Sequence, residues 1–252
     1  FKRIDVLRAL SNNNEAIDLM QKILSGGYRN VRLSQSEQTK LLKDLTQIYY
    51  STGQFSAGLP YFGQLFEIAR NPEDQALAAA ASFEALFQAE RLDDALNLLP
   101  GLAKESAVRY RPRLNVALLK ASDKLVEVGR VNDAALTLNL IKTTDIMIEW
   151  TEGEIESKAA RVKQRTALGN SSSEFIERLQ QEINTLKANL EHLRKLPTLR
   201  NELLVRRARN YTKTARRYEA FWMFYDLMGE NPDDDQAEFY HYATFSNALQ
   251  IG

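Results

Sequence analysis

Apolar residues recur at steps of three and four along the first part of the chain, with short interruptions. In the clearest segment these residues are Leu42, Leu45, Tyr49, Tyr50, Phe55, Gly58, Phe62 and Leu65. The spacing places one apolar face on each of two helices. Gly53 divides the segment and is typical of a tight turn. The segment therefore predicts a helix, a turn and a second helix, closed at Asn71 and Pro72 because proline cannot continue a helix interior.

The same outline recurs along the chain. The small residue at which the second helix approaches the first falls at Gly58, Ala95 and Ala134, at spacings of 37 and 39 residues. A weaker copy contains Ala16, and a strong copy near the end contains Ala220. One such pair cannot bury its apolar face alone, so several pairs must stack to form a continuous core. The pattern predicts an array of helix pairs, with a non-repetitive helical bundle as the alternative.

Two stretches resemble the tetratricopeptide repeat family. They are Tyr49-Gly53-Gly58-Phe62 and Tyr211-Ala215-Ala220-Phe224-Pro232. The resemblance covers roughly residues 1–145 and 198–252, although Glu90 stands at a turn position that the family usually fills with glycine. It implies an all-α superhelical solenoid of antiparallel helix pairs. It also implies that the first helices line a concave surface on which a protein or peptide partner binds.

The middle of the chain, residues 146–197, predicts one elongated helix pair at about 150–168 and 174–195. Ser171 and Glu174 indicate a capping box at the start of the second helix. That helix has apolar residues in a heptad seam: Ile176, Leu179, Ile183, Leu186, Leu190 and Leu193. Three interpretations are open: a stretched unit packed in the solenoid, a projecting hairpin, or a coiled-coil seam for self-association. The expected domains are therefore 1–145, 146–197 and 198–252.

Basic residues concentrate late in the chain. They are Arg194, Lys195, Arg200, Arg206, Arg207, Arg209, Lys213, Arg216 and Arg217. Arg206, Arg209 and Lys213 lie at helical steps of three and four and share one face. We expect this face to hold an acidic peptide or a carboxylate through charge-assisted hydrogen bonds. The alternative is a solvated face balanced by the acidic residues of 226–238.

Aromatic residues also concentrate near the end of the chain. Phe224 belongs to the repeat pattern, whereas Tyr218 and Trp222 fall off its apolar stripe. Tyrosine and tryptophan are enriched at the energetic centres of protein interfaces, so we predict that these two residues contact the partner. Packing between helices is the alternative.

The composition gives no indication of catalysis. His192 and His241 lie on separate predicted helices, there is no cysteine, and no glycine-rich phosphate loop or nucleophile elbow occurs. We therefore expect no enzyme, no small-molecule substrate, no cofactor and no metal site. The 33 basic and 33 acidic residues cancel, which argues against nucleic acid as the partner.

Location follows from weaker signals. A chain without cysteine is compatible with an oxidising compartment, and we favour the bacterial periplasm over the cytoplasm. No apolar run is long enough to span a bilayer. Because the chain begins at Phe1, we expect a part of a longer protein, with any anchor outside it. The predicted function is a protein-binding scaffold in an envelope or secretion assembly. The alternative is a self-associating element that uses the 176–193 seam, and the oligomeric state is left open.

Overall fold

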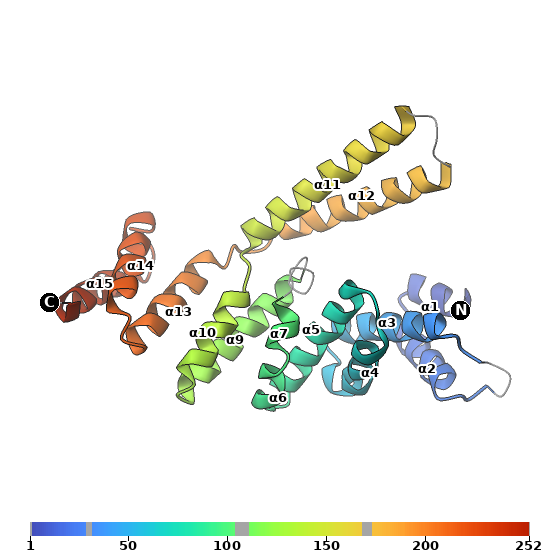
Figure 1. The fold of residues 1–252 in the computed structure, drawn as a ribbon, viewed down its shortest axis with the longest axis horizontal. Coiled ribbons are helices and arrows are strands. Elements are labelled where there is room, and N and C mark those ends of the chain that lie inside the picture. The colour runs from blue at the N-terminus through green and yellow to red at the C-terminus, as the bar shows by residue number, and fades with distance from the viewer. Residues whose placement is uncertain (1, 29–31, 104–110, 168–172, 252) are drawn as a thin grey trace. The chain divides into compact units, whose positions relative to one another are not determined.

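The computed structural model describes residues 2–28, 32–103, 111–167 and 173–251, and every element in these ranges is a helix (Figure 1). This confirms the all-α prediction. The chain divides into two compact units, Phe1–Val108 and Arg109–Gly252. The division differs from the expected boundary at residue 145.

The first unit consists of consecutive helix pairs. Its helices are α1 (Lys2–Ala9), α2 (Asn13–Leu24), α3 (Gln35–Thr52), α4 (Phe55–Ile68), α5 (Pro72–Gln88), α6 (Leu92–Leu96) and α7 (Leu99–Leu102). From α1 to α6 each helix packs on its neighbour in sequence, α3 also packs on α5, and α7 packs on α5. Met20, Leu45 and Phe62 are fully buried in one apolar cluster that joins α1 to α5. The pairs therefore share a core, as the spacing of apolar residues predicts.

The pair that begins with α5 has an interrupted second helix. The helix–turn–helix outline that recurs at Ala95 predicts one second helix here, but the structure has α6 and α7 in its place. Pro100 has no N–H to donate to the carbonyl of Leu96, and its ring would contact that carbonyl in a continuous helix. The helix therefore ends at Leu96 and restarts at Leu99.

The described part of the second unit contains three helix pairs and a final helix. Its helices are α9 (Pro112–Glu127), α10 (Val131–Leu140), α11 (Thr144–Ala167), α12 (Ser173–Leu193), α13 (Arg200–Lys213), α14 (Arg217–Glu230) and α15 (Ala237–Ile251). Although α11 and α12 separate them in sequence, α10 and α13 pack directly on each other. The α11/α12 pair is therefore an insertion between two adjoining helix pairs.

The inserted pair is a helical hairpin in which α11 and α12 lie side by side (Figure 1). The heptad seam of α12 is buried at Leu179, Ile183, Leu186, Leu190 and Leu193. Lys158 of α11 lies 2.7 Å from Glu182 of α12, and the two helices pack mainly against each other. These contacts favour the hairpin interpretation over a unit packed in an array, which would share broad interfaces with α10 and α13.

The base of the hairpin is held by backbone contacts. Thr144 donates from its backbone N–H to the carbonyl of Thr198 at 3.2 Å, and from its hydroxyl to the carbonyl of Pro197 at 2.7 Å. The two hairpin helices lie within Thr144–Leu193, and the expected domain of residues 146–197 stays a prediction. Residue 171 lies outside the described residues, so the predicted capping box with Glu174 stays a prediction.

One turn geometry recurs between the two helices of a pair. The turn residue has a left-handed backbone in each case: Ser11, Gly53, Glu90, Gly129 and Ala215, with φ between 56° and 78°. The next residue donates its N–H to the carbonyl five positions earlier, at 2.8–3.0 Å, as Gln54 does to Tyr49. This is the Schellman arrangement that satisfies the free carbonyls at a helix end. Glu90 and Ala215 thus adopt the conformation that glycine adopts elsewhere in the chain.

The small residue of the second helix follows each turn at a fixed distance. These residues are Ala16, Gly58, Ala95, Ala134 and Ala220, and all five are buried. At Gly58 an added Cβ would lie 2.8 Å from the Cβ of Tyr49, which is too close for two carbon atoms. A small residue is required there because the backbone of α4 approaches α3 closely.

Candidate partner-binding groove

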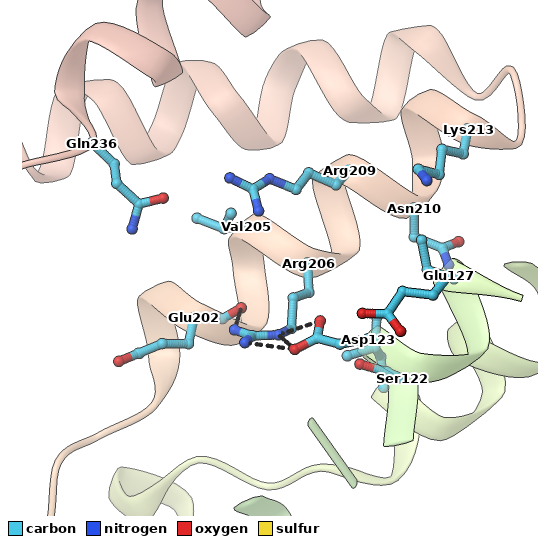
Figure 2. Close-up of a pocket in the computed structure, with 12 residues that line it drawn as sticks. Ser122, Asp123, Glu127, Glu202, Val205, Arg206, Arg209, Asn210, Lys213 and Gln236 are labelled. Atoms are coloured by element: carbon cyan, nitrogen blue, oxygen red, sulfur yellow. Dashed lines mark hydrogen bonds and ion pairs between the residues drawn. The ribbon is translucent and has the colours of Figure 1, made fainter. Parts of the chain in front are cut away.

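A groove of about 600 Å³ lies between α9, α10 and α13 (Figure 2). It is lined by Ser122, Asp123, Val126, Glu127, Leu138, Glu202, Val205, Arg206, Arg209, Asn210, Lys213 and Gln236. Three of the five residues predicted to bind the partner, Arg206, Arg209 and Lys213, are among them. They share one side of α13 because they lie three and four residues apart on a helix.

Arg206 is already engaged by a carboxylate of α9. Its Nε lies 2.9 Å from Oδ1 of Asp123, and its terminal nitrogen donates to Oδ2 at 2.9 Å. The same guanidinium also donates to the backbone carbonyl of Glu202 at 3.1 Å. A two-point pair of this kind fixes the guanidinium in place. Arg206 therefore joins α13 to α9 and shapes the wall of the groove.

Arg209 and Lys213 are differently placed. The guanidinium carbon of Arg209 lies 4.5 Å from the ring centre of Phe239, in a cation–π contact. Neither Arg209 nor Lys213 forms an ion pair with a carboxylate in the described part of the chain, and both are exposed. In Figure 2 Arg206 is directed toward Asp123, whereas Arg209 points toward Gln236. These two cations are therefore accessible to a ligand.

The groove also carries negative charge. Glu127 and Glu202 line it together with Asp123, so its three cations face three carboxylates. Glu127 also forms an ion pair with Lys124 at 3.6 Å, and Lys124 is not one of the residues that line the groove. The surface is therefore mixed in charge, whereas the sequence predicted a basic stripe.

Two polar side chains hold α13 against α10 below the groove. Asn210 donates to the carbonyl of Val131 at 2.9 Å, and Arg207 donates to the carbonyl of Leu138 at 3.1 Å. Burial lowers the pKa of Arg207 from its ordinary value. The Oδ1 atom of Asn210 is buried and accepts no hydrogen bond from the described residues. Asn210 thus brings an acceptor without a donor to the groove lining.

Other members of the basic cluster form ion pairs. Arg194 lies 2.8 Å from Glu152, Arg200 lies 3.0 Å from Glu230, and Arg216 lies 2.7 Å from Glu219. Of the three carboxylates, Glu230 alone belongs to the acidic stretch 226–238 that the sequence suggested as the counter-charge. The cluster is thus balanced largely by carboxylates outside that stretch.

The two predicted aromatic residues lie on a different surface, along α14. Tyr218 and Trp222 are 61% and 45% exposed, with ring centres 6.2 Å apart, and the exposed Tyr225 follows at 5.6 Å from Trp222. None of these residues lines the groove. The structure thus separates the five predicted site residues. Arg206, Arg209 and Lys213 line the groove, whereas Tyr218 and Trp222 lie on the exposed face of α14 and form an aromatic set.

The helix-pair architecture does not require aromatic residues at these positions of α14. Counted from the small residue Ala134 as from Ala220, the corresponding positions of α10 are Asn132, Leu136 and Asn139. The buried face of α14 consists of Ala220, Phe224 and Leu227. The aromatic face is therefore a property of α14 itself.

Sequence reasoning missed the residues that complete the groove. Asp123 is 83 positions from Arg206, and Glu127 lies on the same helix as Asp123. No local pattern indicates that α9 faces α13, because this contact depends on the hairpin being looped out between them. The one indirect signal was the expectation that first helices of successive pairs line a common surface.

The described ranges offer neither a metal centre nor a membrane span. Within them, no cluster of three or more His, Asp or Glu side chains has the geometry to bind a metal ion. No described helix combines the length and the apolar character needed to cross a membrane. Comparison with known proteins gives no assignment, since no family model and no curated protein matches the chain.

Proposed function

We propose that this chain is a non-catalytic scaffold of tetratricopeptide-like helix pairs that binds a protein or peptide partner in the groove between α9, α10 and α13. The observation that carries the proposal is the pair of exposed cations, Arg209 and Lys213, in the lining of this groove. A carboxylate can bind the two cations through charge-assisted hydrogen bonds.

The architecture supports a repeat solenoid. Five turns share one backbone geometry, and each is followed by a buried small residue. The groove is lined chiefly by α9 and α13, the first helices of adjoining pairs. First helices are the elements that the family resemblance assigns to the binding surface.

The mixed charge of the groove limits the kinds of peptide that we expect it to bind. A strongly acidic peptide would be repelled by Glu127 and Glu202, which line the same groove. A peptide with one carboxylate opposite Arg209 and Lys213, and with uncharged or basic residues on either side, fits the charges better. A terminal carboxylate and an Asp or Glu side chain offer the same chemistry.

Self-association through the 176–193 seam is the second candidate. Its buried residues contact α11 of the same chain, so a second copy would have to displace α11. The groove proposal needs no such rearrangement and is preferred. We extend the proposal to a bacterial envelope or secretion assembly, with the periplasm favoured. This step rests on fold-level analogy and on the cysteine-free composition.

Selection from a random peptide library tests the groove directly. We expect peptides that bind the chain to share one carboxylate and to lose at least about tenfold in affinity for the double variant Arg209→Glu, Lys213→Glu. Lys187→Glu provides a matched charge reversal, because Lys187 lies on the exposed face of α12 away from the groove residues. Binding that survives the double variant, or that Lys187→Glu reduces equally, would contradict the proposal.

A further inference from the structure

One face of α15, the last of the described helices, is apolar and is left exposed by the described residues. Tyr242, Phe245 and Leu249 lie at steps of three and four and are 71%, 64% and 67% exposed. The opposite face is buried at Tyr240, Ala243, Thr244 and Asn247. A terminal helix that closes a repeat array normally has a polar outer face. The outer face of α15 is not polar, so it resembles an interface that lacks its second side.

The structure shows what covers the corresponding face of the preceding first helix. α13 and α15 begin 37 residues apart, at Arg200 and Ala237. At this spacing Asn210 corresponds to Asn247, and both are 2% exposed. The spacing also equates Leu203 with Tyr240, which are both buried. The two helices are therefore equivalent on the face that turns toward the preceding pair.

The equivalence breaks down on the other face. Val205 and Ala208 of α13 are buried in a cluster with Phe224 and Leu227 of α14, the second helix of their own pair. Their counterparts on α15 are Tyr242 and Phe245, which are exposed. α15 thus has the neighbour that a first helix receives from the preceding pair. Among the described residues, it lacks the neighbour that a first helix receives from its own pair.

We propose that α15 docks an amphipathic helix donated by a partner protein, which packs on Tyr242, Phe245 and Leu249 as α14 packs on α13. The interface continues the one already present between α13 and α14. α14 presents Ala220, Phe224 and Leu227 at steps of four and three. Because Tyr242 and Phe245 are larger than Val205 and Ala208, the incoming helix must carry small residues in place of Phe224.

Charged residues near the start of α15 indicate the orientation of the incoming helix and the charge of its last turn. A second helix runs antiparallel to the first, so its last turn lies near the start of α15. Glu238 is four residues before Tyr242 on the same face, and Asp233 and Asp235 are exposed just before it. No described cation forms an ion pair with these three carboxylates. A basic last turn is favoured by these charges and by the helix dipole of the incoming helix.

Two synthetic amphipathic peptides provide the probe. Both carry Ala, Ala and Leu at the spacing of Ala220, Phe224 and Leu227, with glutamine elsewhere. One ends in two lysines and the other in two glutamates. By fluorescence anisotropy with the whole chain, we expect the lysine peptide to bind about tenfold more tightly, with the difference shrinking at high salt.

Phe245→Asp should abolish binding of the lysine peptide. The substitution is on the surface, so the far-UV circular dichroism should stay unchanged. Tyr225→Asp, which places the same charge on the exposed face of α14, should leave binding intact. The single groove variant Lys213→Glu, which leaves the contact of Arg209 with Phe239 of α15 in place, should also bind the peptide, so failure of the groove proposal and failure of this one are distinguishable.

Three results would overturn the inference. The first is that neither peptide binds, and the second is that binding is insensitive to Phe245→Asp. The third is a concentration-dependent dimer in sedimentation that Phe245→Asp dissociates, because a second copy would then occupy the face.

Discussion

The guanidinium of Arg206 on α13 and the carboxylate of Asp123 on α9 meet in a two-point ion pair, with Nε 2.9 Å from Oδ1. The side chains are 29% and 48% exposed, so solvent screens the attraction in part. The pair nevertheless connects residues 83 positions apart, on either side of the α11/α12 hairpin. It helps to set the distance between the two helices that line the groove.

Replacing Asp123 by Asn tests the structural role of this pair. The substitution keeps the shape of the side chain and removes the charge, so we expect a loss of about 1 kcal/mol in the free energy of unfolding. A double-mutant cycle with Arg206→Met, measured by denaturant unfolding, separates the pair from its surroundings. Strict additivity of the two single variants would show that the pair contributes nothing to stability.

Asp123→Asn also has an expected effect on binding. Without its carboxylate partner, Arg206 becomes a third available cation in the groove beside Arg209 and Lys213. We expect the affinity for a carboxylate-bearing peptide to rise a few-fold and to depend more steeply on salt. The peptide selected in the groove experiment is the probe, and isothermal titration at two salt concentrations is the measurement. Weaker binding would indicate that the pair positions the groove wall more than it neutralises Arg206.

Gly58 tests the close approach of α4 to α3. In Gly58→Ala the added Cβ would lie 2.8 Å from Tyr49 Cβ and 2.6 Å from Phe62 Cε1, so the helices must separate. We expect a loss of about 1–3 kcal/mol in the free energy of unfolding. Gly63→Ala is the matched control on the same helix, because an added Cβ there has nothing within 4 Å. It should be neutral or stabilising, by up to about 1 kcal/mol. Equal thermal unfolding of the two variants would contradict the packing argument.

Glycine substitutions in the left-handed turns are expected to stabilise the protein, in contrast to Gly58→Ala. Glu90 and Ala215 have φ of 58° and 59°, a conformation that costs residues with a Cβ about 1 kcal/mol. Glu90→Gly and Ala215→Gly should therefore raise the free energy of unfolding, by about 0.5–1 kcal/mol. Ala89→Gly is the control, since Ala89 has φ of −80° and gains nothing from glycine. Destabilisation by all three changes would show that the turns are not strained.

The pattern of helix pairs could be predicted from the sequence because the residues that determine it lie close together in the chain. A left-handed turn, a small residue and apolar residues at helical spacing all occur within one helix pair. That is why Gly58, Ala95 and Ala134 could be placed correctly from the sequence alone. The break in the second helix after α5 was missed, although Pro100 gave a local signal for it.

Only part of the groove could be predicted from the sequence, because its residues come from segments that are far apart along the chain. The shared face of Arg206, Arg209 and Lys213 follows from helical periodicity, so this face could be predicted from the sequence. Their carboxylate neighbours were not, because Asp123 reaches Arg206 only after the hairpin loops out. The hairpin itself was ambiguous, since a heptad seam looks the same whether its partner is α11 or a second copy.

The hairpin gives a pH-dependent prediction through Glu182 and Lys158. The hydrogen bond from Lys158 lowers the pKa of Glu182 below its ordinary value of 4.5. The bond to Glu182 raises the pKa of Lys158 above 10.5. The stabilisation by Glu182 is therefore complete above 4.5 and is lost as the pH falls through its lowered pKa. The stabilisation by Lys158 is complete below 10.5 and is lost as the pH rises through its raised pKa.

Comparison of the wild type with Glu182→Gln tests this window. We expect the variant to be less stable by about 0.5 kcal/mol near neutral pH, since the Glu182 side chain is 38% exposed and solvent weakens the pair. The difference should stay constant between about pH 5 and 10 and decline below about pH 4. Glu156→Gln is the control, because Glu156 is exposed on α11 and no described cation pairs with it. Hydrogen exchange along α11 and α12 locates the effect, and a stability difference independent of pH down to about pH 2 would exclude the ion pair as its cause.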